Sequence, residues 1–249
     1  MVLSCGVLKN AEQIALVFDH LEEITPFQSI DEFLTELAKG SELADITTAV
    51  RDVMMNRTFS VILSHFHEFY RQDWIDWFTV KLTVLLPSFN AEMLSITLSY
   101  VNCTDYQVIV FGMDKVFPEM TSDQIKEITT VLVAYLKEAI FQKHDSACQL
   151  NAQNHAEWLY INLGNFSGYV NYSELKVFNI TWLQSLATLS PAQTAEMLLS
   201  SGTLNNTSQI DAVFDHLEIG NPFQNVDEFL TELAQSPTVS TSSCKCKIH

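Results

Sequence analysis

Glycine is scarce in this sequence, with only 7 in 249 residues. Tight β-hairpins and the loops that cradle nucleotide phosphates need positive backbone φ angles, which glycine adopts at the least cost. The shortage therefore argues against a β-rich protein and against a nucleotide-binding α/β protein. It favours an all-α fold.

Basic residues are also few, since 13 Lys and Arg stand against 30 Asp and Glu, for a formal net charge of −17. A surface of this charge repels phosphate backbones, so nucleic-acid binding is not expected. Acidic membrane surfaces are disfavoured for the same reason. We interpret the charge as one that keeps the protein soluble rather than as a dedicated cation site.

Long apolar runs are missing as well. No uncharged apolar stretch approaches the roughly 18–20 residues needed to cross a bilayer. Hydrophobic residues nevertheless make up 47% of the chain, as in a packed globular protein. Residues 1–9 lack the basic start and the apolar stretch of a signal peptide. An extracellular location therefore requires a signal sequence upstream of residue 1.

Motifs of catalysis and cofactor binding are absent from the sequence. It has no glycine-rich dinucleotide fingerprint, phosphate-binding loop, His-Glu-x-x-His pair, calcium loop or Gly-x-Ser-x-Gly elbow. His65 and His67 are two residues apart on a predicted helix, so they point to different sides and cannot share a metal ion. His20 and His216 are each expected in the last turn of a helix, where they suit the negative end of the helix dipole. We predict no enzyme activity, no cofactor and no metal site.

Acceptor sites for N-glycosylation are what the sequence has in excess. The pattern Asn-x-Ser/Thr occurs at seven of the 14 asparagines, whereas 41 Ser and Thr residues would place about two by chance. A preference of Asn, Ser and Thr for helix starts explains only part of this excess. We therefore predict glycans, with one shared between the last two sites, which overlap. The candidate acceptors are Asn56, Asn102, Asn165, Asn171, Asn179, Asn205 and Asn206.

Two of the five cysteines are predicted to form a disulfide. Cys103 and Cys148 flank two segments with helical periodicity, 106–117 and 123–142. Because an antiparallel helix pair returns the chain to its starting end, the two cysteines are expected to meet at its base. Such a bond contributes about 2–4 kcal/mol, mainly by restricting the unfolded chain.

The remaining cysteines have no evident function. Cys5 lacks an obvious partner in this chain. Cys244-Lys-Cys246, followed by His249, fits zinc poorly because only one residue separates the two cysteines. An interchain disulfide or a disordered tail over residues 237–249 is the better interpretation.

An internal duplication is the most specific feature of the sequence. Residues 6–40 and 202–236 align without a gap at an offset of 196, with 22 identities in 35 pairs. This exceeds what a shared amphipathic pattern produces. The chain is therefore expected to hold residues 1–40 as the end of one repeat unit, 41–201 as the body of a unit, including the hairpin 103–148, and 202–236 as the start of the next copy.

Each copy is predicted to form a helix pair. Asn10 and Gln13, and then Ser29 and Glu32, have capping-box spacing, and Pro26 is expected in the turn between the two helices. Thr121 and the run Ser190-Pro191-Ala-Gln193 open further helices. A helix over 73–86 carries aromatic residues that are predicted to be core rather than a binding patch. These aromatic residues and their neighbours are Phe66, Phe69, Tyr70, Trp74, Trp77 and Phe78.

About ten to twelve helices with short connections predict an α-solenoid of helix pairs. The stretch LATLSPAQTAEMLLSSGTL at 186–204 and the repeated VFDHLE and VDEFLTEL blocks resemble the helical repeats of mesothelin-like proteins, a family that includes stereocilin and otoancorin. The similarity is greatest to the long multi-repeat members predicted in fish, and it extends to NCTDYQVIV and NFSGYVNYSEL. The resemblance implies a right-handed superhelix of armadillo- or HEAT-like helix pairs that acts in adhesion at cell surfaces or in the extracellular matrix.

Two function classes follow. The first is a secreted structural or adhesive glycoprotein, whose partners are other copies of the repeat, bound head-to-tail as in a filament, or extracellular glycoproteins. The alternative is an intracellular helical scaffold that binds peptides along a concave groove. Head-to-tail assembly is expected because neither copy has gained charge on its apolar face, as a capping repeat should. The matching apolar positions are Ile14, Val17, Phe18 and Phe33, and Ile210, Val213, Phe214 and Phe229.

Overall fold

The computed structural model describes residues 10–40, 46–150, 154–178, 189–201 and 207–235. Every regular element in these ranges is a helix, which confirms the all-α prediction. The described residues form 13 α-helices, slightly more than the ten to twelve expected, and several of these helices pass into 3-10 or π-helical turns.

The chain forms two compact units. The first, here the N-terminal unit, comprises residues 1–151 and 161–165, and the second, the C-terminal unit, comprises 152–160 and 166–249. The boundary lies inside the stretch 41–201, so the compact units do not follow the division suggested by the repeat.

The N-terminal unit holds α1 to α8. Its α-helices are α1 (Ala11–Leu21), α2 (Pro26–Ala38), α3 (Thr48–Ile62), α4 (Arg71–Asp76), α5 (Ala91–Leu98), α6 (Cys103–Val116), α7 (Ser122–Lys137) and α8 (Ala147–Leu150). Short 3-10 segments lie at Leu63–Glu68, Leu86–Ser88 and Phe117–Glu119, and π-helical segments at Trp77–Lys81 and Glu138–Gln142.

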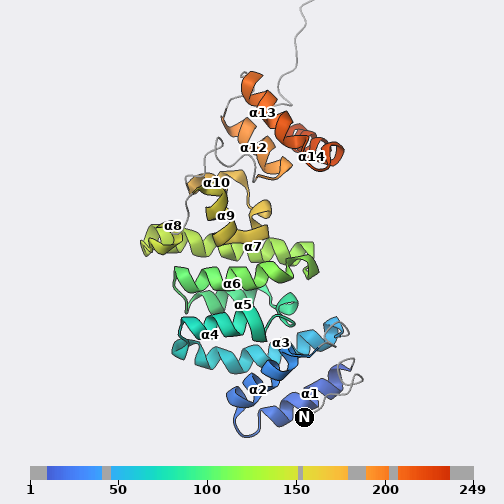
Figure 1. Cartoon of the computed structure of the whole chain (residues 1–249), viewed down its shortest axis with the longest axis vertical. Helices are drawn as coiled ribbons and strands as arrows, with labels where there is room; N and C mark the ends of the chain where they lie inside the picture. Colours follow the sequence, from blue (N-terminus) through green and yellow to red (C-terminus); the bar gives the residue numbers. More distant parts are fainter. Residues whose placement is uncertain (1–9, 41–45, 151–153, 179–188, 202–206, 236–249) are drawn as a thin grey trace, which may run out of the picture. The chain divides into compact units, whose positions relative to one another are not determined.

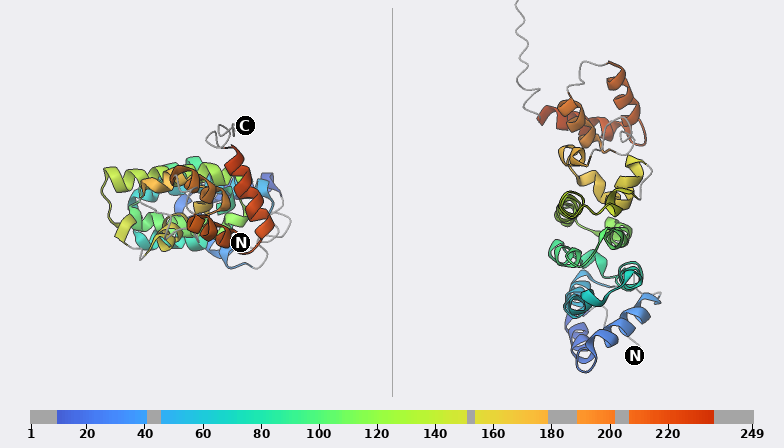
Figure 2. Two further views of the ribbon diagram at one scale, coloured as in Figure 1. Left: turned by 90° about the horizontal axis from the view of Figure 1, so that it is seen from above. Right: turned by 90° about the vertical axis from the view of Figure 1, so that its left-hand side faces the viewer.

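Helices of this unit are stacked in chain order (Figure 1) and fall into two columns when seen from the side (Figure 2). Helix α1 packs on α3, α2 packs on α3 and the π-helix Trp77–Lys81, and α4 and that π-helix pack on α6. The helices approach closely at Gly112 of α6, where an added Cβ would clash with the Phe78 carbonyl oxygen. The order of contacts means that each helix pair is covered by the pair that follows it.

The remaining helices begin with α9 (His155–Leu163), whose last residues belong to the N-terminal unit. A 3-10 segment (Gly164–Tyr169), α10 (Tyr172–Val177), α12 (Pro191–Ser201), α13 (Thr207–Leu217) and α14 (Pro222–Gln235) follow. Within the C-terminal unit, α12 packs on both α10 and α14.

Helix starts follow the expected signals at three places. Asn10 accepts hydrogen bonds from the amides of Glu12 and Gln13 at 2.9 and 3.2 Å. Thr121 caps α7, and Ser190 forms a reciprocal capping box with Gln193, with distances of 3.3 and 2.8 Å. Proline at the first position of α12 agrees with its fixed φ angle.

The second helix of each copy starts earlier than expected. Helix α2 begins at Pro26 and α14 at Pro222, so the prolines open these helices instead of lying in the turn. Asn225 does not cap a helix; its side-chain amide donates to the carbonyls of Leu217 and Ile219 at 3.0 and 2.9 Å. The prediction of a cap at Ser29, and with it at the equivalent Asn225 of the second copy, was wrong because a proline costs nothing in the first turn, where its missing N–H has no partner to lose.

The expected single helix over 73–86 is also interrupted. Helix α4 ends at Asp76 and passes into the π-helix Trp77–Lys81, where the Leu82 amide donates to the Trp77 carbonyl at 2.9 Å. Thr79 and Thr83 donate their hydroxyls to carbonyls of the preceding turn. Such bonds compete with regular helix geometry.

Candidate functional site

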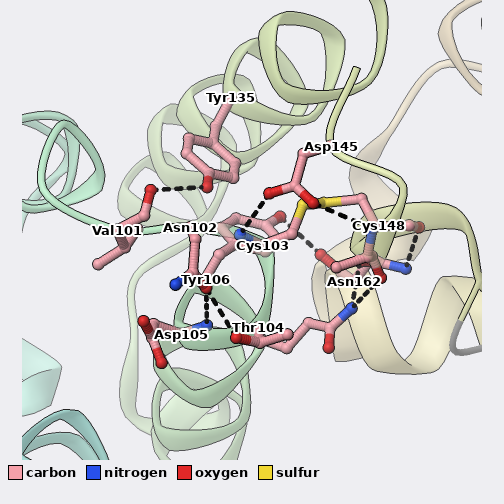
Figure 3. The surroundings of a disulfide bond; sticks show 12 residues. Val101, Asn102, Cys103, Thr104, Asp105, Tyr106, Tyr135, Asp145, Cys148 and Asn162 are labelled. Atoms are coloured by element: carbon pink, nitrogen blue, oxygen red, sulfur yellow. Dashed lines mark hydrogen bonds between the residues drawn. A yellow bond between two sulfur atoms is a disulfide. The ribbon is translucent and has the colours of Figure 1, made fainter. Parts of the chain in front are cut away.

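The disulfide is the most elaborate polar site among the described residues. Cys103 is the first residue of α6 and Cys148 lies in α8, and the structure joins them with their Cα atoms 5.4 Å apart. This is the pair that the sequence predicts (Figure 3), and the two cysteines meet because α7 and the segment after it return the chain to the start of α6. Both cysteines are buried, with 0 and 1% of their surface exposed. Because it is buried and the described residues hold no further cysteine beside it, this disulfide is a structural staple rather than a redox centre.

The Asp145 carboxylate holds the two helix starts together. One oxygen accepts from the Cys103 amide at 3.1 Å, and the other accepts from the Ala147 amide at 3.0 Å. The backbone amide of Asp145 donates to the Ala139 carbonyl at 2.8 Å. A charged acceptor at two helix N-termini is favourable because it satisfies free amides and complements the helix dipoles.

Two buried tyrosines and Asn162 complete the surroundings of the disulfide (Figure 3). Tyr106 and Tyr135 stack with ring centroids 4.5 Å apart, and their hydroxyls donate to the carbonyls of Asn162 and Val101 at 2.6 and 3.1 Å. Burial raises the pKa of both hydroxyls well above the ordinary value, so both stay protonated donors. The Asn162 amide donates to the Cys148 carbonyl at 3.5 Å and accepts from Gln107 at 3.1 Å. Sequence reasoning missed this network, because its members are far apart in the chain.

All four sequon asparagines within the described ranges have exposed side chains. They are Asn56, Asn102, Asn165 and Asn171. Asn56 lies in the middle of α3, Asn102 and Asn171 immediately precede α6 and α10, and Asn165 lies in a 3-10 segment. The fold therefore leaves room for a sugar at each of them.

The local hydrogen bonds at these asparagines are compatible with a glycan. Asn102 uses its Oδ1 to accept from the Asp105 amide at 3.0 Å and from the Thr104 hydroxyl at 2.7 Å, which leaves Nδ2 for a sugar. Asn165 Nδ2 donates to Asp114 at 2.9 Å, and a glycosylated amide keeps one N–H for this bond. The sequon of Asn56 differs, because its Thr58 is fully buried and the Thr58 hydroxyl has no hydrogen-bond partner.

Several candidates lie outside the described residues. These are Asn179, Asn205, Asn206, Cys5, Cys244 and Cys246, together with the tail 237–249.

Histidines and aromatic residues have structural surroundings. His65 contacts the Phe27 ring with centroids 4.2 Å apart, and its Nδ1 lies 3.0 Å from Glu68. Of the six aromatic residues of the group, Phe66, Trp74, Trp77 and Phe78 are buried core, as predicted, whereas Tyr70 is 81% exposed. In the described part of the chain, no three His, Cys, Asp or Glu side chains gather as metal ligands.

The residues expected to mediate self-association differ in how exposed they are. Ile14, Phe18, Val213 and Phe229 are buried, whereas Val17, Phe33 and Ile210 are half-buried, and Phe214 is 39% exposed. The eight residues therefore do not form one common exposed face, and their role in head-to-tail association stays a prediction. Different faces of the two helix pairs are covered, because α1 and α2 pack against the helices that follow them, whereas α14 packs against α12, which precedes it.

A shallow pocket of about 270 Å³ lies between α4 and α6 of the N-terminal unit. It is lined by Arg71, Ile75, Thr79, Gln107, Val108 and Phe111. Phe111 is 48% exposed and lies under the Lys115 ammonium group, 4.5 Å from the ring centroid. Asp105, whose carboxylate lies 3.5 Å from Arg71, has its pKa raised by burial.

None of the helices described here combines the length and the apolar character needed to cross a membrane. No protein-family model, no curated protein and no solved structure matches this chain.

Proposed function

We propose that this chain is a non-enzymatic structural or adhesive module of an extracellular glycoprotein built from tandem helical repeats. The observation that carries the proposal is the buried disulfide between Cys103 and Cys148. Structural disulfides form and persist in secreted proteins and are rare where cytosolic reductants act. The same compartments attach N-linked glycans.

The sequons support the same location independently. The sequon Asn102-Cys103-Thr104 contains one of the bonded cysteines, and its asparagine caps α6 while its side chain stays exposed. Exposure of the other three described acceptors means that the folded protein accommodates sugars at these positions without losing core contacts.

The duplicated helix pair supports the repeat organisation. Successive helix pairs cover one another within the N-terminal unit, as they do in α-solenoids. The resemblance to mesothelin-like proteins adds the expectation of a right-handed superhelix and a place at the cell surface or in the extracellular matrix. Partners in this proposal are other copies of the repeat or extracellular glycoproteins.

Secretion of the full chain behind a signal sequence from cultured animal cells tests the proposal. Glycosidase treatment should shift the protein to lower mass, and alkylation without reductant should leave Cys103 and Cys148 unlabelled. Asn102→Gln should remove one glycan, whereas Asn90→Gln should remove none. Asn90 is the matched control because it is exposed and caps α5 in the same way, with a 2.9 Å bond from Met93, but it is not in a sequon. Secreted protein without any hexosamine would contradict the proposal.

A peptide-binding scaffold is the second candidate, and the pocket beside Phe111 favours it. An apolar floor next to a guanidinium and an amide suits a peptide with a carboxylate. Its volume of about 270 Å³ is below the ~300–1,000 Å³ of usual ligand pockets. Failure of glycosylation together with full labelling of all cysteines would favour this alternative.

A further inference from the structure

The helix pair α1–α2 binds the rest of the N-terminal unit through one defined face, here called the forward face. Its apolar centre consists of Ile14, Phe18, Ile30 and Leu34, all with 0% exposure. Phe27 extends it, with its ring centroid 4.2, 6.2 and 5.7 Å from those of His65, Phe69 and Trp77. The covering surface belongs to α3 and the segments that follow it, up to Lys81.

Charged groups frame this forward face. Arg57 of α3 pairs with Glu22 at 2.8 Å and with Asp19. Lys81 of the π-helix pairs with Asp31, and its ammonium lies 4.9 Å from the centroid of the Trp77 ring. Three acids of the helix pair thus meet two cations of the surface that covers them, which fixes its orientation as well as its position.

The same face recurs on α13–α14, where all of it is exposed except Ile210 and Val226, which are half-buried. Its counterparts are Ile210, Phe214, Asp215, Glu218, Phe223, Val226, Asp227 and Leu230, identical to the first copy except for Val226 in place of Ile30. Phe223 is 85% exposed, Leu230 51% and Phe214 39%. Asp215, Glu218 and Asp227 are exposed as well, and within the described ranges none of them forms an ion pair.

The second copy presents this face in the same form as the first. The ring pair inside each helix pair is conserved: Phe18 and Phe33 lie 5.6 Å apart at 77°, and Phe214 and Phe229 lie 5.9 Å apart at 71°. The two helices of each copy therefore meet through the same ring contact. A surface that fits α1–α2 also fits α13–α14.

We propose that the forward face of α13–α14 binds the α3–Lys81 surface of a second copy of this chain, where it takes the place of that copy's own α1–α2. This rests on the repeat organisation in the proposed function and names the partner surface. Three acids and the Phe223 ring are retained at this exposed face. A partner surface explains their retention if it carries Arg57 and Lys81 together with the rings that contact Phe27. These rings are His65, Phe69 and Trp77. A general adhesive surface requires no such match.

The second copy must compete with an internal occupant. In each chain, α1–α2 is tethered to α3 by residues 39–47, so its effective concentration is of the order of millimolar. Nearly identical faces have nearly equal intrinsic affinities, and the wild-type chain is therefore monomeric at micromolar concentrations. Weakening the internal contact and strengthening the external one should shift this balance.

A charge exchange between two full-length variants tests the proposal. Arg57→Glu in one chain repels its own Asp19 and Glu22, and Asp215→Lys with Glu218→Lys in another chain provides a complementary partner. Each variant alone should sediment as a monomer at about 1–100 µM, whereas their mixture should form a complex at least ~10-fold tighter than either with wild type. The corresponding exchange at the second ion pair, a Lys81→Glu chain mixed with an Asp227→Lys chain, should give the same result.

Apolar controls distinguish this face from nonspecific adhesion. Phe223→Ser in the lysine variant should abolish the complex. Ile219→Ser should leave it intact, because Ile219 is 68% exposed but corresponds to Glu23 and lies outside the conserved face.

Folded variants, as judged by helical circular dichroism, that remain monomeric in both mixtures would overturn the inference. The readout does not depend on glycans or on secretion. If the mixtures stay monomeric although the wild-type protein is glycosylated, the inference fails and the proposed function stands. If the complex forms but the chain is never glycosylated, the inference stands and the proposed function fails.

Discussion

The two copies of the helix pair have nearly the same sequence but opposite surroundings. In α1–α2, Phe18 is fully buried and Phe33 only half-buried, whereas in α13–α14 the counterpart Phe214 is 39% exposed and Phe229 is 2% exposed. The ring contact inside each pair has nearly the same geometry. Burial is therefore set by the neighbouring helices and not by the pair's own sequence.

Histidine shows the same contrast on the other face. The His216 Nε2 atom of α13 lies 3.2 Å from the carbonyl oxygen of Leu189. Leu189 is the residue before Ser190, which caps α12. His20 of α1 instead lies 3.3 Å from Glu23 and is 74% exposed. Each pair thus has one face for a preceding helix and one for a following helix, and among the described residues α1–α2 is covered on the second face and α13–α14 on the first.

Truncation of the two phenylalanines should produce the largest difference between the copies. Phe18→Ala should destabilise the α1–α2 region by about 3–5 kcal/mol, because it empties a closed core site, whereas Phe214→Ala should cost less than about 1 kcal/mol. Amide hydrogen exchange, read separately for each helix pair, measures both changes.

The reciprocal substitutions provide the control for this difference. Phe229→Ala should reduce protection in α13–α14 more than Phe33→Ala does in α1–α2, because the order of burial is reversed. Equal losses at equivalent positions would show that the pairs are stabilised by their own sequence, and the comparison would fail.

Removal of the disulfide should separate the stapled unit from the second helix pair. Cys103→Ser with Cys148→Ser opens a connection that spans 45 residues, and the loop-entropy relation predicts a loss of about 4 kcal/mol. Exchange protection should fall in α6 to α8 and remain unchanged in α13–α14. Equal loss in both regions would mean that the disulfide stabilises the whole chain.

The sequence was sufficient to predict the helical class, the disulfide pair and the aromatic core, because these depend on periodicity and spacing along the chain. It was insufficient for the forward face. Ile14 and Phe18 have the same pattern as Ile210 and Phe214, and only the helices packed against them decide which are buried. The network around Asn162 escaped prediction for a related reason, since Tyr106, Gln107 and Cys148 meet it only after folding.

A smaller effect is expected in α3, the surface on which α1 packs. Thr58 is fully buried and its hydroxyl has no partner, so Thr58→Val should stabilise the N-terminal unit by about 1 kcal/mol. Urea unfolding of unglycosylated protein measures the change, because the substitution also removes the Asn56 sequon. Thr58→Ser keeps the hydroxyl and should give no gain. A loss of stability with valine would indicate that the hydroxyl is hydrogen-bonded.

The ion pairs at the forward face should give the smallest difference between the copies. Asp19→Asn with Glu22→Gln removes both partners of Arg57, whose side chain is 35% exposed, and should cost at most about 1 kcal/mol in α1–α2. Asp215→Asn with Glu218→Gln removes the same charges where no cation of the described residues pairs with them, and it should be neutral or slightly stabilising, because the chain carries a net charge of −17. The pKa of Arg57 is raised, mainly by its hydrogen bond with Glu22. The guanidinium therefore keeps its charge, and its part in the ion pair, until the pH rises through that raised pKa. Salt distinguishes the two cases further, since screening should reduce the cost in α1–α2 between low and high ionic strength. A similar, salt-sensitive cost in α13–α14 would mean that its acids already have a cationic partner, and the forward face of the second copy would then not be free to bind another chain.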